Sequence, residues 1–511
     1  MTDTLAALLS THPGDAAAIG APDRSWMTFA GLAAQGERTR AACHAAGIGR
    51  GDRVAIVLPN GPEMAAAFVA LAQVCTTAPL NPAYRQEEFA FYLTDLKARA
   101  IVLAEGQAGA ALLAAQAAGL QVLRLTFDAS DPAGTFTLTP EGAVPGPPDR
   151  AGPGSQDVAL ILHTSGTTSR PKIVPLTQAN LAASARNIGA SLALSADDRC
   201  LNMMPLFHIH GLIAAVSASL AAGAGVWCAP GFDGLRFFGW LDTAKPSWYT
   251  AVPTMHQMIL SRAARNAEII ARNPLRLIRS SSASLPAQVM VELGKTFNAP
   301  VIEAYGMTEA THQMASNPLP PRAQKPGSVG IAAGPRIAIA HEVENRLIEG
   351  TGEVVISGPN ITPGYEGNPE ANAKNFFADA GVRWFRTGDQ GALDAEGYLT
   401  LTGRLKEIIN RGGEKVSPLE VDGVLMDHPA VAQVVTFAMP HPKLGEEVAA
   451  AVVLREGMAA DEAALRRFAA ERLADFKVPR RVVVLADIPK GATGKLQRIG
   501  LAEKLGLGTP S

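Results

Sequence analysis

The residues with the clearest capacity for chemistry form a loop rich in hydroxyl groups. Residues 163–177 read HTSGTTSRPKIVPLT. Hydroxyls, the free backbone amides of a Ser/Thr/Gly turn and one cation, Lys172, are groups that bind phosphate oxygens. A glycine precedes the lysine of a Walker loop, whereas Pro171 stands here and has no N–H to donate. The segment therefore predicts a phosphate-binding loop of another kind. An ordinary strand-to-helix turn, with Thr177 capping the helix, is the alternative on composition alone.

Other short motifs follow this loop along the chain. They are YGMTE at 305–309, RTGD at 386–389, GRLKE at 403–407 and PKGATGK at 489–495. In this order, and together with TSGTTSRPK at 164–172, they resemble the motifs of the acyl-adenylate-forming superfamily of acyl-CoA synthetases, luciferases and peptide-synthetase adenylation domains. The resemblance covers nearly the whole chain, although Ser169 and Ile173 stand where many members carry glycine. It implies a ligase that activates a carboxylic acid with ATP, releases AMP and transfers the acyl group to coenzyme A.

The resemblance also implies roles for single residues in the nucleotide site. Asp389 would accept both ribose hydroxyls, with Arg404 as its basic companion, because two hydroxyls need a charged two-oxygen acceptor. Thr308 would bond the α-phosphate and Glu309 would hold Mg²⁺. Lys495 resembles the lysine that bridges the attacking carboxylate and the ATP oxygens, although a lysine in a Gly-rich turn is often only exposed. The predicted nucleotide-binding set is Thr164, Ser165, Gly166, Thr167, Thr168, Lys172, Tyr305, Thr308, Asp389, Arg404 and Lys495, with Thr308, Glu309 and Lys495 catalytic.

A different set of residues is implied for the transfer to coenzyme A. In this superfamily the small C-terminal domain swings between the two half-reactions, and Lys406 matches the hinge position. The segment RGGEK at 411–415 resembles the loop that lines the pantetheine tunnel. Gly412 and Gly413 would let the backbone pass close to a ligand, although a Gly-Gly turn is also common in ordinary connections.

The acyl pocket is bounded in this superfamily by segments that match 204–212, 279–285 and 305–314. Ser281 and Ser282 stand where many members carry glycine, and His208 and His312 add donors, with His210 close by. A buried histidine is often only a structural residue. Donors on several pocket segments nevertheless predict a short polar pocket, since a fatty chain would leave them unpaired. The exact sequences of these motifs resemble those of the oxalyl-CoA synthetase branch, so oxalate is the expected acid. Another short diacid, an aromatic acid and a medium-chain fatty acid are alternatives.

These residues need a scaffold, and the chain predicts an α/β fold. Short β-rich runs alternate with Ala-rich amphipathic stretches up to about residue 330, and a Pro- and Gly-rich surface connection covers about 142–157. We expect a large N-terminal domain, 1–403, of mixed α/β subdomains with a β-rich subdomain at about 336–403. A small mobile α+β C-terminal domain, 404–511, would follow, with the hinge near Lys406.

Composition narrows the class of protein. The 511 residues are 47% hydrophobic and 18% charged, as in a multidomain globular protein, and apolar runs are shorter than a membrane span. A net charge of -2 gives no electrostatic case for binding nucleic acid. Four cysteines without metal-ligand spacing favour a reducing compartment, and neither end resembles a targeting signal. We expect a cytoplasmic protein that acts on small-molecule substrates.

Alternative functions share some of these motifs. A free-standing enzyme that loads a carrier protein would share every nucleotide motif, but this chain ends soon after Lys495. A nucleotide-binding protein without activity would be expected to lack Glu309, Asp389 or Lys495. A P-loop kinase is disfavoured by Pro171.

Overall fold

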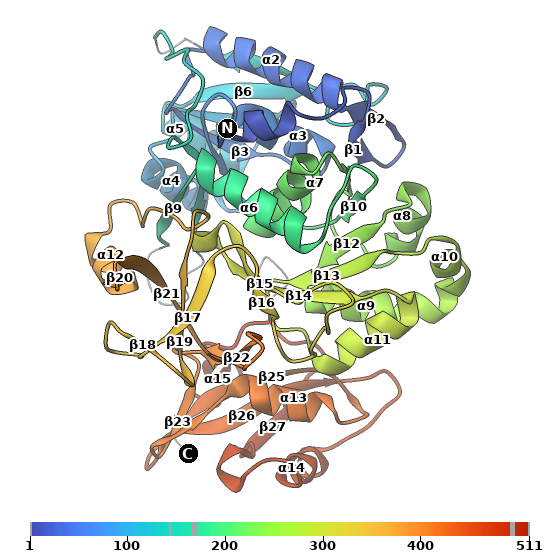
Figure 1. Ribbon diagram of the computed structural model, residues 1–511, viewed down its shortest axis with the longest axis vertical. Helices are drawn as coiled ribbons and strands as arrows, with labels where there is room; N and C mark the ends of the chain where they lie inside the picture. Colours follow the sequence, from blue (N-terminus) through green and yellow to red (C-terminus); the bar gives the residue numbers. More distant parts are fainter. Residues whose placement is uncertain (1–2, 143–145, 165–170, 491–495, 509–511) are drawn as a thin grey trace.

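The computed structural model describes residues 3–142, 146–164, 171–490 and 496–508. Figure 1 shows a large part, coloured from blue to light orange, above a smaller part in darker orange and red. The described residues form a 7-stranded, a 9-stranded, a 6-stranded and a 5-stranded sheet. The predicted fold class, a large N-terminal α/β domain with a smaller C-terminal domain, is confirmed.

The 7-stranded sheet holds the base of the hydroxyl-rich loop. Its central strands are short apolar runs that pair in parallel and are buried, the pattern of strands covered by helices. The edge strands β7 and β9 pair antiparallel with their neighbours. In sheet order the strands are β7 (Thr137–Glu141), β6 (Gln121–Thr126), β5 (Ala100–Ala104), β3 (Arg53–Val57), β4 (Thr76–Pro79), β8 (Val158–His163) and β9 (Ile173–Thr177).

The 9-stranded sheet brings several of the later motifs together. Strands β10 to β14 pair in parallel, so their carboxyl ends lie along one edge, where ligands bind in open α/β sheets. Ser282 follows the end of β13, and Thr308 follows the end of β14. In sheet order the strands are β16 (Ile331–Ala332), β15 (His312–Ser316), β14 (Val301–Met307), β13 (Leu277–Ser281), β12 (Trp248–Ala251), β10 (Arg199–Asn202), β11 (Gly225–Cys228), β1 (Ala17–Ala21) and β2 (Arg24–Thr28).

A layer of helices fills the space between these two sheets. Helix α3 (Pro62–Leu71) contacts β4 of one sheet and β1 and β11 of the other, and α6 (Gln178–Ser191) contacts β8, β9 and β15. Every residue of α3 from Met64 to Leu71 is buried, which explains why this helix is apolar on all sides. A π-helical turn, η1 (His210–Ser217), continues into α7 (Ala218–Ala221) in the same layer.

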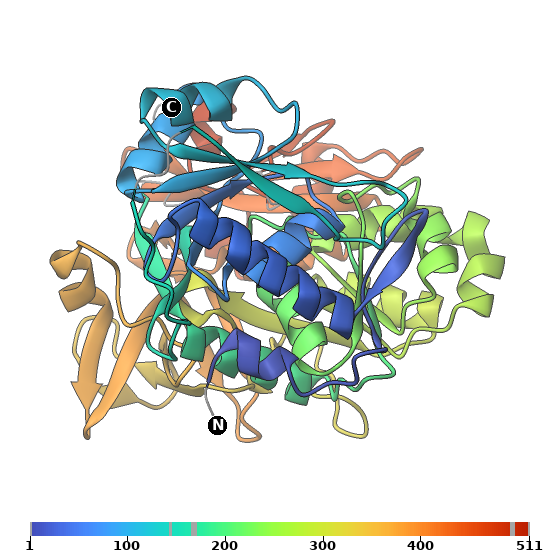
Figure 2. The same ribbon diagram turned by 90° about the horizontal axis from the view of Figure 1, so that it is seen from above.

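The remaining helices of the large part lie around these layers. Figure 2 shows α2 (Phe29–Ala45) running across the molecule, where it packs on α3 and β7. In α11 the buried residues Val289, Leu293 and Phe297 recur at helical spacing, as in a surface helix with one apolar face. The other helices here are α1 (Leu5–Leu9), α4 (Gln86–Asp95), α5 (Ala110–Ala117), α8 (Phe237–Ala244), α9 (Pro253–Ala263), η2 (Ala264–Asn266), α10 (Ala267–Arg272), α11 (Ala287–Phe297) and η3 (Thr308–Ala310).

A third sheet extends from Arg336 to Arg404, and its strand pairs are antiparallel. It places Asp389 of β21 directly opposite Arg404 of β22. Its strands are β18 (Leu347–Ile348), β17 (Arg336–Ala340), β19 (Thr351–Ser357), β21 (Val382–Leu393) and β20 (Phe376–Asp379), with β22 (Leu399–Arg404) also paired to β21 and α12 (Pro369–Asn375) beside them.

The smaller part is an α+β unit that follows the turn at Lys406. In the described residues, no helix is both long enough and apolar enough to cross a membrane. The domain limit at residue 404 and the hinge at Lys406 stay predictions. The elements of this part are β23 (Ile409–Arg411), β24 (Glu414–Val416), α13 (Pro418–Met426), β25 (Val431–His441), β26 (Gly445–Leu454), α14 (Glu462–Ala470), η4 (Asp475–Lys477), β27 (Arg481–Val484) and α15 (Leu501–Lys504).

Candidate active site

The hydroxyl-rich loop connects two antiparallel strands, β8 and β9. Thr164 and Lys172 close the base of the loop with two hydrogen bonds. The Thr164 amide donates to the Lys172 carbonyl at 3.0 Å, and the Lys172 amide donates to the Thr164 hydroxyl at 3.3 Å. A strand, not a helix, follows the loop, so the alternative of a strand-to-helix turn is wrong. Thr177 does cap α6, and its hydroxyl accepts the Asn180 amide. The predicted ligands Ser165, Gly166, Thr167 and Thr168 lie outside the described residues.

Lys172 and Glu309 both contact Tyr365. The Lys172 ammonium lies 4.4 Å from the centre of that ring, and the Tyr365 hydroxyl donates to Glu309 Oε1 at 2.7 Å. Burial raises the pKa of Glu309, while Tyr365 and the nearby cations oppose the rise. Burial lowers the pKa of Lys172, and the negative charge of Glu309 opposes that shift. Thr308 begins the same short turn, η3, so the YGMTE motif and the loop lysine lie together.

Asp389 is oriented by two neighbours on different strands. Its Oδ2 accepts the hydroxyl of Tyr305 from β14, and its Oδ1 lies 3.1 Å from Arg404 Nε. Asp389 is 5% exposed, whereas the Arg404 side chain is 56% exposed. A carboxylate has about four acceptor positions, so each oxygen keeps one for a ligand. The arrangement therefore suits a pair of adjacent hydroxyl groups.

A cavity of about 220 Å³ extends from Asp389 and its partners to the acyl wall, which consists of the predicted acyl residues together with His210. It is lined by Tyr305, Asp389 and Arg404 on one side and by Ser282 and Glu303 on another. The structure thus brings the YGMTE, RTGD and GRLKE motifs and the serine cluster to one cavity. Lys495, the predicted adenylation lysine, lies outside the described residues.

The serine and histidine side chains of the acyl wall form a connected group. His210 Nδ1 lies 3.0 Å from Ser282 Oγ, and its Nε2 lies 2.6 Å from Thr250 Oγ1. The ring of His312 is perpendicular to that of His210, with centroids 5.0 Å apart. Of the four predicted acyl residues, Ser281 and Ser282 lie at the carboxyl end of β13, and His312 begins β15 opposite Met307, the last residue of β14. His210 joins them.

The predicted acyl residues differ in how available they are. The hydroxyl of Ser281 donates to the Ala304 carbonyl at 2.8 Å, so it is engaged inside the sheet. Ser282 lines the cavity. His208 is half-buried two residues before His210, and its carbonyl accepts the Leu212 amide one turn later.

Several of these residues have unusual backbone angles. The φ values of Ser282, Thr311 and His312 are 74°, 49° and 94°, in the left-handed region that non-glycine residues rarely adopt. Such conformations persist only where the surroundings hold them, and they cluster at functional sites. The acyl wall is therefore held in one shape by its packing.

The predicted hinge residue lies near the nucleotide group, and the predicted tunnel glycines form a turn in the smaller part. Lys406 is exposed and close enough to Lys172 to lower the pKa of that lysine. Gly412 and Gly413 form the tight turn between β23 and β24, with φ values of 59° and 98° that favour glycine. A Cβ atom at residue 412 would also lie 2.9 Å from a Leu444 methyl carbon.

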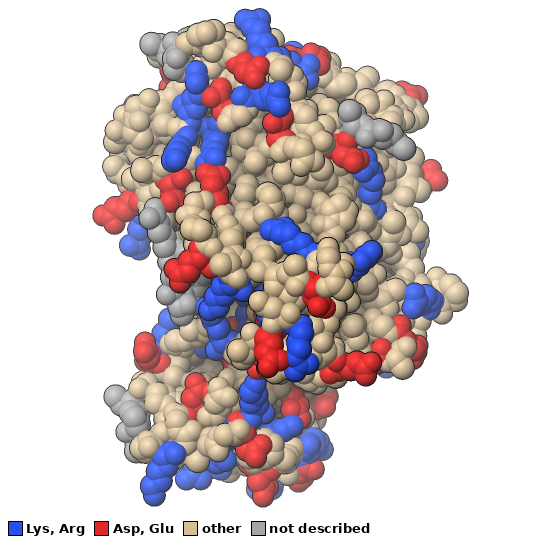
Figure 3. Space-filling model, turned by 60° about the vertical axis from the view of Figure 1, so that its left-hand side comes forward, with Lys and Arg blue, Asp and Glu red and all other residues tan. Residues whose placement is uncertain are grey.

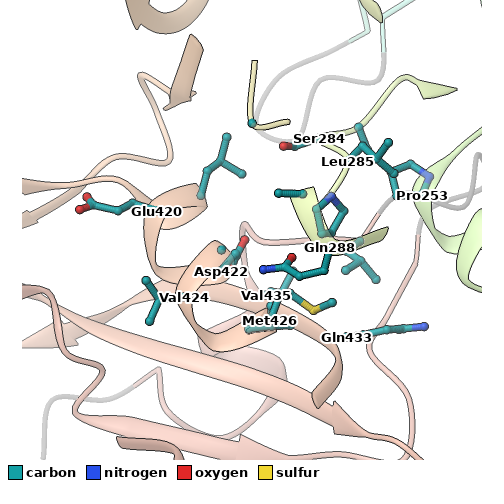
Figure 4. Close-up of a pocket in the computed structure, with 18 of the residues that line it drawn as sticks. Pro253, Ser284, Leu285, Gln288, Glu420, Asp422, Val424, Met426, Gln433 and Val435 are labelled. Atoms are coloured by element: carbon teal, nitrogen blue, oxygen red, sulfur yellow. The ribbon is translucent and has the colours of Figure 1, made fainter. Parts of the chain in front are cut away.

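A cavity of about 690 Å³ lies between the two parts of the molecule. Figure 4 shows Ser284, Leu285 and Gln288 of the large part facing Asp422 and Met426 on α13. It adjoins the smaller cavity, because both include Ala283, Ser284, Leu401 and Leu419. We assign the chemistry to the smaller cavity, since the polar motif residues converge there.

Some functional candidates escaped the sequence analysis. Tyr365, whose hydroxyl donates to Glu309, lies in a loop with no motif of its own. Glu303, buried at 2% exposure, lines the cavity two residues before Tyr305. Arg279 interrupts the apolar run of β13, and a charged residue inside a buried strand was a usable signal. On the face shown in Figure 3, positive and negative side chains are interspersed, in keeping with the small net charge.

Comparison with known proteins agrees with this geometry. The AMP-binding enzyme family matches residues 6–366, and the AMP-binding enzyme C-terminal domain matches residues 420–495. An oxalate–CoA ligase of Arabidopsis thaliana is 46% identical over 459 residues, which cover 89% of this chain and 88% of the relative. An oxalate–CoA ligase of Saccharomyces cerevisiae is 42% identical over 478 residues, covering 89% and 87%.

Solved structures share the whole architecture. The crystal structure of ATP-bound MatB from Rhodopseudomonas palustris is 29% identical, covers 99% of both chains and superimposes with a TM-score of 0.88. The membership predicted from the ordered motifs is confirmed: the chain belongs to the AMP-binding enzyme family.

Proposed function

We propose that this protein is an AMP-forming acid–CoA ligase and that its acid is oxalate or a similar short polar diacid. ATP, the acid and coenzyme A are its substrates. The observation that carries the proposal is the single cavity that contains both Asp389 with its partners and the polar wall at Ser282. Its similarity to the two oxalate–CoA ligases supports the same reaction.

The first half-reaction joins the acid to AMP. Attack of the carboxylate on the α-phosphorus of ATP expels pyrophosphate, so negative charge must be stabilised on several oxygens. In this proposal Asp389 and Tyr305 hold the ribose, and Thr308 and Lys172 contact phosphate oxygens. Lys495 is the cation shared by the acid and ATP, a role that rests on its motif.

Glu309 suits a magnesium ion in this scheme. Mg²⁺ in nucleotide enzymes is usually held by one or two carboxylates together with phosphate oxygens and water. In the part of the chain that the structure describes, no cluster of three or more acidic, His or Cys side chains could hold a metal by itself. A single oriented carboxylate near Lys172 fits an ion that arrives with ATP. Such an ion neutralises phosphate charge when bound.

The second half-reaction transfers the acyl group to the thiol of coenzyme A. We propose that the C-terminal domain turns at Lys406 and brings the Gly412–Gly413 turn toward the acyl group. The cavity between the two parts gives this domain a gap to move across. The four cysteines are buried and unbridged, in keeping with a cytoplasmic location.

The choice of acid rests on the polar wall. At neutral pH oxalate carries two charges, and its second carboxylate must exchange water for hydrogen-bond donors. Ser282 lines the cavity at its predicted acyl end, His210 contacts Ser282, and His312 packs on His210. A hydrocarbon chain would instead leave these polar groups without partners.

The test is to incubate the purified protein with ATP, Mg²⁺ and oxalate, with and without coenzyme A, and to measure the products. AMP, pyrophosphate and oxalyl-CoA are expected when coenzyme A is present. Production of ADP and phosphate would overturn the ligase proposal. If a carrier protein accepts the acyl group and coenzyme A does not, the enzyme is a carrier loader.

A further inference from the structure

Arg279 is a buried cation directly behind the acyl wall. It lies on β13, is 0% exposed, and forms no ion pair with a carboxylate in the described ranges. Its Nη1 lies 3.4 Å from both His210 Nε2 and Thr250 Oγ1, and its Nη2 donates to Gln313 Oε1 at 3.2 Å. Burial lowers the pKa of Arg279 to about 10, so the side chain keeps its charge at neutral pH.

Gln313 holds the guanidinium in this direction. Its amide nitrogen donates to Ser191 Oγ at 2.9 Å and to the Ala333 carbonyl at 3.3 Å. Because the nitrogen is engaged by these acceptors, the oxygen of the amide must face Arg279. The Arg279 side chain is therefore positioned by the core and not by a ligand.

A guanidinium can only donate hydrogen bonds, and this determines which ring nitrogen of His210 carries the proton. Arg279 points an N–H at His210 Nε2, so that nitrogen must present a lone pair. Thr250 accepts from Arg279, which directs its own proton to the same Nε2. With one proton on the His210 ring, that proton is then on Nδ1 and is donated to Ser282 Oγ.

We infer that Arg279 is a positioning residue for the acid, because it sets a chain of donors that ends in the hydroxyl proton of Ser282 pointing into the cavity. The inference rests on the proposed function and deepens it. With Nδ1–H of His210 occupying an Oγ lone pair, the Ser282 proton is free to bond an anionic oxygen. The chain also brings the field of a buried cation toward the second carboxylate of a dianionic acid.

Without Arg279, the direction of the hydrogen bonds from Thr250 through His210 to Ser282 is expected to reverse. In Arg279→Met, His210 can carry its proton on Nε2 and donate to Thr250 Oγ1. Nδ1 then becomes an acceptor, and the Ser282 hydroxyl turns toward it and away from the cavity. The loss should appear as weaker binding of the acid, whereas the ATP site is unaffected.

The tautomer is the first readout, and it needs no catalysis. ¹⁵N-histidine NMR of the full-length protein without ligands, with the His210 signals assigned from a His210→Gln variant, should show the proton on Nδ1. Arg279→Met should move the proton to Nε2 or to a mixture of both nitrogens. A proton on Nε2 in the wild type, or the same tautomer in both proteins, would overturn the inference.

Kinetics provide the second readout. Arg279→Met should raise the KM for oxalate roughly tenfold to a hundredfold, the range for a lost donor to a charged group, with the KM for ATP unchanged. Arg279→Lys keeps a charged donor, so it should recover part of the affinity, and it serves if the Met variant does not fold. Arg276→Met also removes an arginine, one residue before β13, but that arginine pairs with Asp198 at 2.9 Å; this variant is the control and should leave both KM values unchanged.

A double-mutant cycle tests whether Arg279 acts through Ser282. Ser282→Gly suits the positive φ at this position and removes the terminal hydroxyl. In that background, Arg279→Lys should have much less effect on the KM for oxalate than in the wild type. Full additivity, or equal increases in the KM for ATP and oxalate, would overturn the inference. The protein could instead show the expected tautomers but release no AMP with any acid. That result would overturn the proposed function and, with it, the role of Arg279 in acid binding.

Discussion

At the scale of single residues, Asp389 is an acceptor that is oriented before any ligand binds. Tyr305 holds one oxygen and Arg404 holds the other, and they come from separate sheets. Burial beside Asp389 raises the pKa of Tyr305, so its hydroxyl keeps its proton and remains a donor. The carboxylate therefore needs little reorganisation to bind a ribose.

Removing one of these partners should weaken ATP binding specifically. Tyr305→Phe keeps the ring but loses the donor to a charged acceptor, a bond worth about 1.5–3 kcal/mol, or roughly tenfold or more in the KM for ATP. Tyr398→Phe, which loses a bond to the Ala323 carbonyl away from the cavity, is the control. Steady-state kinetics with ATP varied would show the difference, and equal KM values for the two variants would contradict this role of Tyr305.

Glu303 predicts a dependence of stability on pH. Burial raises its pKa from 4.5 to about 8, so the folded chain keeps this proton while the unfolded chain loses it above pH 4.5. Between these values the unfolded state binds fewer protons, and the free energy of unfolding falls as pH rises. Glu303→Gln keeps an acceptor for the Leu285 amide but cannot ionise.

The melting temperature of Glu303→Gln relative to wild type should therefore increase from pH 5 to pH 8. Thermal unfolding of both proteins across this range measures the effect. A difference that stays constant with pH would show that Glu303 ionises normally.

At the scale of elements, the pairing of β14 with β15 shapes the acyl end of the site. Gly306 lies against the backbone of His312, and a Cβ atom at residue 306 would lie 1.9 Å from the His312 carbonyl oxygen. The strands approach this closely only because residue 306 has no side chain. His312 and the Thr308 turn depend on that approach.

Gly306→Ala should consequently separate β14 from β15 and disturb both the acyl end of the site, at His312, and the nucleotide end, at the Thr308 turn. We expect a loss of stability of about 1–3 kcal/mol from overpacking and a larger loss of activity. Gly294→Ala in α11 is the control, because its new methyl group meets no atom closer than 3.6 Å and alanine favours a helix. Denaturant unfolding and AMP release would measure both effects, and an active, stable Gly306→Ala protein would contradict the packing argument.

The sequence was sufficient for elements whose signal is local. The apolar runs VALILHTS and PVIEAYG predicted strands where β8 and β14 lie, whereas the assignment of Glu309, Asp389 and Arg404 to the site stays a prediction from the ordered motifs. The strand β9 was missed because Pro175 and the preceding turn signals hide a strand of five residues. The Arg279 chain could not be predicted, since Thr250, His210 and Gln313 come from separate elements and only the folded sheet brings them together.

At the scale of the whole molecule, two parts must cooperate in two different reactions. The Lys415 ammonium contacts Glu342 Oε2 of the large part at 2.6 Å, and Gln257 of the large part donates to the Ala432 carbonyl at 3.0 Å. Arg498, three residues after Lys495, lies 3.2 Å from Glu407 beside the hinge. The turn that contains the predicted hinge and the residues that follow the PKGATGK motif are therefore linked by an ion pair.

Separate variants should divide the half-reactions. Lys495→Ala should lower adenylate formation by roughly two to three orders of magnitude, the scale of losing one preorganised charge. It should leave the reaction of synthetic acyl-adenylate with coenzyme A. Lys406→Pro restricts rotation at the hinge, so it should reduce thioester formation more than adenylate formation. Pyrophosphate exchange and thioester assays measure the two steps, and equal losses in both assays for either variant would contradict the division.

The central claim is that one cavity combines an AMP-forming site with a wall that selects a small polar diacid. The most direct measurement is kcat/KM of the wild-type enzyme for oxalate against hexanoate and coumarate, followed by AMP release in the presence of ATP, Mg²⁺ and coenzyme A. The structure predicts that oxalate is the preferred acid, because the Ser282 hydroxyl, oriented by His210, replaces water around its second carboxylate. Faster turnover of hexanoate or coumarate than of oxalate would contradict the claim.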